Sequence, residues 1–183
     1  AELAAAFGRV PLSRLDAEID RGLDRLVEWF EVDRSSLTEV GLDDEALLVT
    51  HSRVRPGFEP FTRDDVRPRV PFSARIVLAG RTISYDRPEA LSPEHADLRR
   101  FAESEGMLSH VTTPISVGEQ VVGGLHVATL SRHRSWSEVD LRQLETLAHV
   151  FAGAVERRRF SRLARESREL TEAVLRSIED LVV

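Results

Sequence analysis

The sequence predicts one α+β domain that continues into a long, coiled-coil-like helix, and three observations carry this prediction. Apolar residues recur at helical spacing over residues 12–30, which indicates an amphipathic helix. Two β-rich runs, at residues 108–117 and 120–130, are joined by Gly118 and Glu119, which is typical of a hairpin. A second helical pattern extends from Trp136 to the end of the chain. With 183 residues, 42% of them hydrophobic, the chain suits one ordinary domain plus an extension.

The first half of the chain supplies the other elements in order. The apolar stripe of the first helix consists of Leu12, Leu15, Ile19, Leu23, Leu26 and Phe30. Ser13 is a candidate N-cap, and Pro11 leaves the start open by a residue or two. Residues 36–40 and 46–54 are predicted strands, separated by the turn-forming residues 41–44.

The middle of the chain alternates loops with short elements. Residues 55–71 are rich in proline and charge and are predicted to form a loop. A short helix over 72–79 is closed by Gly80, and residues 82–85 form a short strand. Another helix begins at Ser92, with proline in its first turn, and stops at Gly106.

The predicted hairpin places two histidines on neighbouring strands. Pairing Val117 with Gln120 puts one set of side chains on one face, namely Val111, Thr113, Ile115, Val122, Gly124, His126 and Ala128. The other face then carries Leu108, Thr112, Pro114, Val121, Leu125 and Val127. Both faces are apolar, so both should be covered, and the glycines at 123 and 124 would let a helix or loop approach closely. In this register His110 and His126 point to opposite faces, and only a bulge could bring them together.

The last helix has two apolar patterns. Either Ser135 or Ser137 could cap it. Its first stripe consists of Leu141, Leu144, Ala148, Phe151 and Val155. From Phe160 the stripe narrows to a heptad seam of Phe160, Leu163, Ser167, Leu170, Val174, Ser177 and Leu181. Beyond Arg159 the helix is so polar that it has no hydrophobic core of its own to join. A parallel partner helix would supply one.

Composition excludes several classes of function. Cysteine is absent, which removes disulfides, thiolate metal sites and cysteine nucleophiles. The net charge is −6, which disfavours a general nucleic-acid surface. All 25 basic residues are arginine. No apolar run is long enough for a membrane span and no signal peptide is recognisable. Histidine pairs of the metalloprotease type, phosphate loops and nucleophile elbows are absent from the sequence as well, so we expect no metal site and no catalysis.

Several segments together resemble the GAF sensor domains of histidine kinases and of activators of sigma-54-dependent transcription. They lie at residues 32–37, 50–52, 106–110 and 121–125, and the most specific one is Arg134-Ser135-Trp136-Ser137 leading into Leu144 and Phe151. The resemblance covers residues 11–159. It departs at Arg53 and Phe72, where related sequences often carry tryptophan, so the identity of a ligand does not carry over.

The resemblance implies a fold, a site and an assembly. It implies a central antiparallel sheet with the terminal helices on one face and short helices and loops enclosing a ligand pocket on the other. Strand parity and the family layout nominate as pocket residues Phe72, Ile76, Tyr85, Phe101, Met107, Ser109, His110 and Thr112. We expect a cytoplasmic homodimer formed through the N- and C-terminal helices, with Phe160, Leu163, Leu170, Val174 and Leu181 at the dimer seam.

The same resemblance predicts the domain organisation. Residues 1–10 lead in, residues 11–159 form the sensory domain, and residues 160–183 form a signalling helix. We expect the chain to be a piece of a larger protein, such as a histidine kinase, whose linked output domain follows, because residues 175–183 resemble the lead-in to a PAS domain. The expected function is binding a small molecule and relaying the signal through the last helix.

Alternatives remain at the level of the ligand. Without cysteine, neither bilin attachment nor thiol-based sulfoxide reduction is available, and without asparagine and lysine the Asn-Lys-Phe signature of the cyclic-nucleotide subgroup cannot exist. One histidine among His51, His110, His126 and His149 could hold haem, as in a gas sensor, or all could be structural. Ligand-free dimerisation and relay is the alternative function.

Each of two arginine clusters in the sequence also allows two interpretations. Those at 53, 55, 63, 67 and 69 could form a cationic rim that guides an anionic ligand, or a solvated loop paired with Asp64 and Asp65. Those at 157–159, 162 and 165 are better explained as a charged coiled-coil flank than as a nucleic-acid surface, because no groove-reading motif accompanies them.

Overall fold

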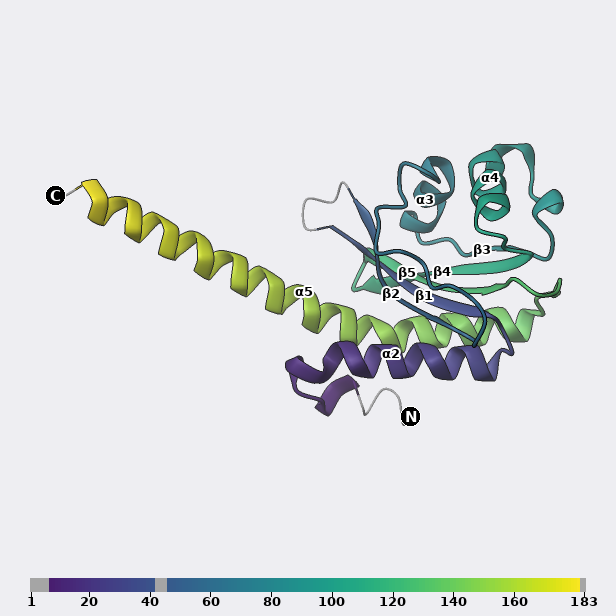
Figure 1. Cartoon of the computed structure of the whole chain (residues 1–183), viewed down its shortest axis with the longest axis horizontal. Coiled ribbons are helices and arrows are strands. Elements are labelled where there is room, and N and C mark those ends of the chain that lie inside the picture. Colours follow the sequence, from purple (N-terminus) through teal and green to yellow (C-terminus); the bar gives the residue numbers. More distant parts are fainter. Residues whose placement is uncertain (1–6, 42–45, 182–183) are drawn as a thin grey trace.

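Helices cover both faces of a five-stranded sheet in the computed structural model, which describes residues 7–41 and 46–181 (Figure 1). The strands are β1 (Arg34–Val40), β2 (Leu47–Val54), β3 (Ile83–Tyr85), β4 (Ser109–Val117) and β5 (Gln120–Thr129). All neighbouring pairs are antiparallel, in the order β2-β1-β5-β4-β3. This arrangement confirms the predicted fold class. The predicted turn at 41–44 falls largely outside the described residues.

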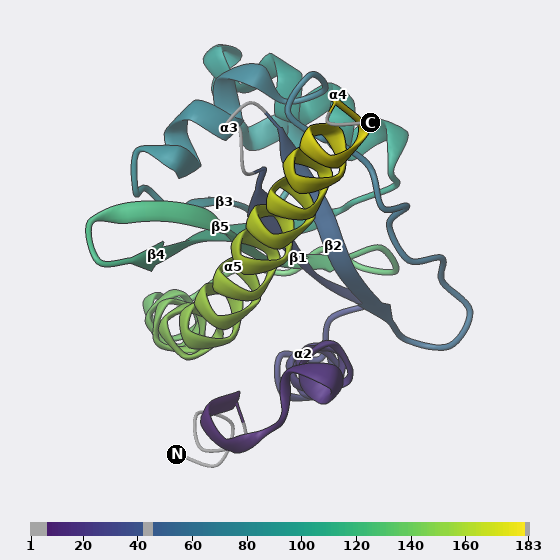
Figure 2. The ribbon, with the colours of Figure 1, turned by 90° about the vertical axis from the view of Figure 1, so that its left-hand side faces the viewer.

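One face of the sheet packs on the two longest helices, α2 (Leu12–Trp29) and α5 (Glu138–Leu181). They lie side by side on this face of the sheet, and α2 runs along the first half of α5 (Figure 1). Figure 2 shows the two helices nearly end-on. Most of the predicted stripes face inward: Leu15, Ile19, Leu23 and Leu26 of α2 are buried in one cluster with Leu144, Ala148, Phe151 and Val155 of α5. Leu12, the first member of the α2 stripe, is exposed instead. Each fully buried leucine or phenylalanine contributes about 1.5–3 kcal/mol, so this layer dominates the core. Ser13 does not cap α2, because the helix already begins at Leu12, directly after Pro11.

The opposite face carries α3 (Pro71–Leu78), α4 (Ala96–Ser104) and two short 3-10 turns, η1 (Pro88–Ala90) and η2 (Pro93–His95). The helix predicted from Ser92 therefore begins as a separate 3-10 turn and becomes α-helical only at Ala96. Gly80 and Gly106 follow the two helices in left-handed conformations, with φ of 78° and 65°. These are the expected glycine stops.

A bulge in the β4–β5 hairpin reverses the predicted parity beyond the turn. Val117 pairs with Gln120 as predicted, but the register shifts between Ile115 and Ser116. Ile115 then pairs with Gly123, and Thr112 with His126. The expected grouping of Val111 and Ile115 with His126 and Ala128 is therefore wrong. On the helix side the two β4 residues pack with Leu125 and Val127, and on the other side His126 shares its face with His110 and Thr112.

Gly123 allows a close approach, but by a strand. A Cβ atom added there would lie 2.0 Å from the carbonyl oxygen of Thr38 on the neighbouring β1. The expectation of a helix or loop at this point is corrected: the tight contact is part of the sheet, beside the bulge.

The second half of α5 projects away from the domain (Figures 1 and 2). Its predicted seam is exposed, with exposed fractions of 65% for Phe160, 67% for Leu170 and 51% for Val174. The backbone of Leu181 is helical, but its side chain lies outside the described residues. No helix of the described part is long and apolar enough to cross a membrane.

Candidate functional site

A small cavity lies between the sheet and helices α3 and α4. Its volume is about 50 Å³. At roughly 10–15 Å³ per water-sized atom, it holds roughly three to five non-hydrogen atoms, far fewer than the ~300–1,000 Å³ of common ligand pockets. Apolar side chains form most of its wall: Leu47, Val49, Phe61, Val66, Val70, Ala74, Val77, Ile83, Leu98 and Phe101. The polar lining residues are Ser36, Thr38, Ser73, His110, Thr112 and His126.

The structure brings three of the eight nominated pocket residues to this cavity: Phe101, His110 and Thr112. Tyr85 and Met107 are buried in the core cluster on the cavity side, but do not line the cavity. Ser109 is also buried, but it precedes His110 on β4 and so points to the opposite face, where its hydroxyl donates to the carbonyl of Asp86 at 2.7 Å.

Phe72 and Ile76 lie outside the cavity, where they line a surface depression. Helix α3 turns Ser73, Ala74 and Val77 inward instead. Residues 72–79 mix polar and apolar side chains, so their apolar periodicity was too weak to predict which side of the helix faces the cavity.

A hydrogen-bonded chain of histidines and threonines runs along the cavity floor. The Thr38 hydroxyl lies 2.9 Å from Nε2 of His126, and Nδ1 of His126 lies 2.9 Å from the Thr112 hydroxyl. The same hydroxyl lies 3.2 Å from Nε2 of His110. The two imidazoles stack with centroids 5.8 Å apart. The bulge creates this chain, and Thr38 and His126 are members that the sequence prediction missed.

Both floor histidines are held neutral. Burial lowers the pKa of His126 to about 4. Burial, reinforced by His126 and Arg34, lowers the pKa of His110 well below its usual value. A neutral imidazole donates from one nitrogen and accepts at the other, so the chain has a direction set by the tautomers.

A column of aromatic rings and arginines stands beside the cavity. The Arg34 guanidinium lies 3.7 Å from the ring centroid of Phe61, which stacks on Phe101 at 5.8 Å. Arg69 lies over the other ring at 4.5 Å. Glu105 joins both ends, with 3.6 Å to Arg34 and 2.7 Å to Arg69. Phe61 comes from the 55–70 loop, so this column anchors the loop over the cavity.

The loop arginines pair with acids from other elements. Arg53 contacts Asp24 of α2 at 2.8 Å, and Arg55 contacts Asp33 at 3.4 Å. Asp64 and Asp65 accept hydrogen bonds from backbone N–H groups instead. Neither sequence-based interpretation fits fully, since most of these pairings tie the loop to the domain.

On the opposite face, three consecutive arginines fix the point where α5 leaves the domain. Arg157 donates to the carbonyl groups of Phe7 and Val10, and Arg159 donates to the carbonyl of Val40 at 2.8 Å. Arg158 reaches Asp16 at 2.6 Å and the buried Glu39 at 3.4 Å. These residues are a joint between α5 and the domain, which corrects their assignment to a coiled-coil flank.

Strand β1 connects the joint to the cavity. Successive side chains of a strand point to opposite faces. Thr38 lines the cavity, whereas Glu39 faces α5, where its carboxylate also accepts from Thr50 at 2.8 Å. His51 belongs to this second cluster, with Nε2 accepting from Arg158 at 3.0 Å. Burial and then Arg158 lower the pKa of His51 to about 4.

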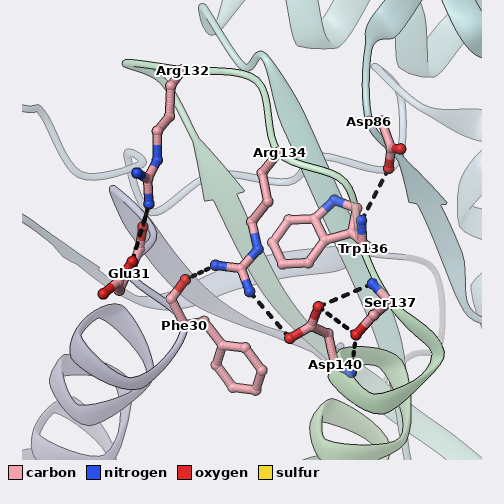
Figure 3. Close-up of polar contacts among 8 residues, drawn as sticks. All are labelled: Phe30, Glu31, Asp86, Arg132, Arg134, Trp136, Ser137 and Asp140. Atoms are coloured by element: carbon pink, nitrogen blue, oxygen red, sulfur yellow. Dashed lines mark hydrogen bonds and ion pairs between the residues drawn. The ribbon is translucent and has the colours of Figure 1, made fainter.

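Hydrogen bonds and an ion pair also hold the start of α5 against the domain (Figure 3). Ser137 is the cap: its backbone N–H donates to Asp140 at 3.0 Å, and its hydroxyl accepts from the Asp140 N–H at 3.1 Å. Arg134 bridges the carbonyl of Phe30, at the end of α2, to Asp140. The indole of Trp136 donates to the carbonyl of Tyr85 on β3 at 3.1 Å. The arginine-serine-tryptophan-serine motif therefore fixes the start of α5 both to the end of α2 and to strand β3 of the sheet.

Comparison with known proteins identifies the family. A family model described as a GAF domain matches residues 13–156. The chain belongs to the GAF family. A search of curated proteins gives no significant match.

Solved GAF structures share the fold. The GAF domain region of a Geobacter sulfurreducens protein is 22% identical, with a TM-score of 0.60, covering 78% of this chain and 93% of that one. The blue-light-absorbing form of the Thermosynechococcus elongatus PixJ GAF domain is 18% identical, with a TM-score of 0.60 and coverages of 85% and 93%. The far-red-absorbing dark state of JSC1_58120g3, with bound biliverdin, is 14% identical, with a TM-score of 0.67 and coverages of 85% and 96%.

Large prosthetic groups do not fit this site. A cavity of about 50 Å³ is much too small for a bilin or a haem, and the chain has no cysteine for covalent attachment. Of the four histidines considered for haem, His51 lies in the Arg158 cluster and His149 is exposed on α5. The ring nitrogens of His126 and Nε2 of His110 contact threonine hydroxyls. Within the described residues, no cluster of three metal-ligating side chains occurs.

Proposed function

We propose that this GAF domain is the sensory module of a multidomain signalling protein of the histidine kinase or sigma-54 activator kind. It binds a small molecule in the cavity, works in the cytoplasm as a homodimer through α2 and α5, and passes the signal along α5 to a linked output domain, such as a PAS domain. GAF domains are generally regulatory rather than catalytic, and residues 160–183 would be the signalling helix.

One observation carries the proposal: α5 belongs both to the domain core and to an exposed apolar seam. Phe151 and Val155 are fully buried under the sheet, whereas Phe160, five residues after Val155, is 65% exposed. The arginine joint at 157–159 lies between these two parts. A shift of β1 would therefore change the direction or rotation of the projecting helix, and a dimeric bundle amplifies such a change.

A second copy of the chain is the partner that fits the seam. The seam follows an alternating spacing of three and four residues, which is the pattern of two-stranded packing. Ser167 and Ser177 interrupt it, so the helix pair would be stable enough to form yet weak enough to repack. Leu12 and Trp29 of α2 are 50% and 57% exposed and would extend the contact.

Acidic substitutions in the seam should dissociate the dimer. Leu170→Glu combined with Val174→Glu places charges where apolar side chains would be buried, and we expect dimerisation to weaken at least ~100-fold, from about 1.5–3 kcal/mol per lost apolar contact. Multi-angle light scattering of the full chain measures the mass. Both side chains are more than half exposed in the single chain, so the variant should stay folded, with the circular dichroism spectrum of the unmodified chain.

Leu175→Glu is the matched control. Leu175 is 56% exposed and lies one position off the seam. Its replacement by glutamate makes the same kind of change, from an apolar side chain to an acidic one. It should leave the dimer intact. A dimeric seam variant, or equal loss of dimer in the control, would contradict the proposed assembly.

A second candidate function is ligand-free dimerisation and relay, favoured by the small size of the cavity. At about 50 Å³ the space could be an ordinary packing defect rather than a site. The two functions differ in whether occupancy of the cavity changes the dissociation constant of the dimer.

A further inference from the structure

Three buried polar side chains lie in one row across four strands. Arg34 on β1 pairs with Ala128 on β5, which pairs with His110 on β4, which pairs with Tyr85 on β3. Directly paired residues of neighbouring strands point to the same side. His110 lines the cavity, so the whole row belongs to the cavity face. Arg34, Tyr85 and His110 are only 3%, 4% and 4% exposed.

Each of these three side chains has one polar atom without a hydrogen-bond partner among the described residues. The atoms are Nε of Arg34, the hydroxyl of Tyr85 and Nδ1 of His110, and all three are buried. Buried polar atoms are normally paired, so three unpaired ones in one row indicate a missing polar group. Ala128, a small residue, separates the arginine from the histidine in this row.

The charges around the row favour a single negative charge. The terminal nitrogens of Arg34 face Glu105, with 3.3 Å to its carbonyl and 3.6 Å to its carboxylate. Arg69 contacts the same carboxylate at 2.7 Å. Two guanidinium groups thus share one carboxylate, which leaves one positive charge uncompensated. Nε of Arg34 is buried and has no hydrogen-bond partner among the described residues, so its N–H group is available to donate to an anionic oxygen.

We propose that Arg34, Tyr85 and His110 bind the carboxylate of a small organic acid whose short apolar part occupies the neighbouring cavity. This inference rests on the proposed sensory function and names the chemical class of its ligand. The Nε–H of Arg34, the hydroxyl of Tyr85 and the Nδ1–H of His110 supply three donors to two oxygens. The volume of about 50 Å³ limits the apolar part to a few carbon atoms.

Binding in this way sets the direction of the whole hydrogen-bond chain. When Nδ1 of His110 donates to the carboxylate, its Nε2 must accept from the Thr112 hydroxyl, 3.2 Å away. Thr112 then accepts from Nδ1 of His126, and Nε2 of His126 accepts from Thr38. The Thr38 hydroxyl can then no longer donate to the carbonyl of Gly124. The change ends next to Glu39, the partner of Arg158 in the α5 joint.

Propionate is the probe that tests the proposal. In the ¹⁵N-labelled chain, the Nε–H signal of Arg34 reports binding and that of Arg158 reports the joint, and each is assigned from its loss in the Arg→Lys variant. We expect millimolar propionate to shift the Arg34 signal saturably. Propionamide, which has the same shape but no charge, should bind at least about tenfold more weakly.

Tyr85→Phe distinguishes a binding role from a structural one. It removes only a hydroxyl that has no hydrogen-bond partner within the described part of the chain, so the melting temperature should stay equal or rise, whereas propionate affinity should fall about tenfold. Equal affinity for the two probes, an unchanged affinity in Tyr85→Phe, or no saturable shift would overturn the carboxylate site. A shift of Arg34 without any shift of Arg158 would leave the site standing and count against the proposed relay, so the two failures are distinguishable.

Discussion

Gly123→Ala should unfold the domain. The new Cβ would lie 2.0 Å from the carbonyl oxygen of Thr38 and 3.2 Å from the Cα atom of Glu39. Both atoms belong to the backbone of strand β1. The clash can therefore be relieved only by moving β1 and β5 apart, which would break hydrogen bonds between them. We expect a loss of at least about 4 kcal/mol, in the range of the most damaging core substitutions, measured by urea unfolding followed by circular dichroism.

Gly153→Ala is the matched control for this prediction. Gly153 lies in α5, and an added Cβ there would meet no atom of the described residues within 4 Å. Alanine is the better helix former, so stability should rise by about 0.5–1 kcal/mol. A Gly123→Ala protein that is as stable as the unmodified chain would mean that the β1–β5 contact beside the bulge is looser than described.

Acid should destabilise the protein well above the pH at which carboxylates protonate. The pKa values of His126 and His51 are lowered to about 4 from 6.5, and that of His110 is lowered as well. Because the unfolded chain then binds more protons, stability is full above pH ~6.5 and is lost as pH falls towards 4. At ~1.4 kcal/mol per unit, the first two histidines together cost roughly 4 kcal/mol at pH 5.

The measurement is the urea-unfolding free energy at a series of pH values from 7.5 to 5. The variant His126→Gln removes one titrating group and keeps a polar side chain between Thr38 and Thr112, so the curve should become flatter while the stability at pH 7.5 falls moderately. An unchanged slope in this variant, or no loss of stability down to pH 5, would show that the floor histidines are not held neutral by burial.

The periodic elements of this fold were predictable because local sequence alone decides them. The stripe of α2 and the first stripe of α5 carry an apolar residue at nearly every third or fourth position, and the structure buries most of each stripe as predicted, whereas Leu12, at the start of α2, is exposed. Gly80 and Gly106 marked the helix ends because only glycine adopts their left-handed conformation easily. The exception is the capping of α2, where Pro11 rather than a serine side chain precedes the helix.

The cavity floor could not be predicted, because one extra residue decides it. Val122 forms a bulge that rotates the far part of β5 by one position and so brings His126 beside His110. The only local signal was the adjacent pair of glycines, which indicated a close approach without saying to what. Contacts between distant segments, such as Arg34 with Phe61 or Arg158 with Glu39, depend on tertiary packing and leave no periodic pattern in the sequence.

Filling the cavity from within tests most directly whether the cavity is coupled to the dimer. Ala74 lines the cavity from α3 and is 3% exposed, so Ala74→Leu places a branched side chain where a ligand would lie. Ala79→Leu, at the exposed residue directly after the same helix, makes the same change outside the cavity. Sedimentation velocity over a dilution series gives the dimer dissociation constant of each variant. If occupancy and dimer packing are linked, Ala74→Leu should change this constant at least about fivefold relative to Ala79→Leu. Equal constants for the two variants would contradict a sensory cavity and favour a ligand-free relay.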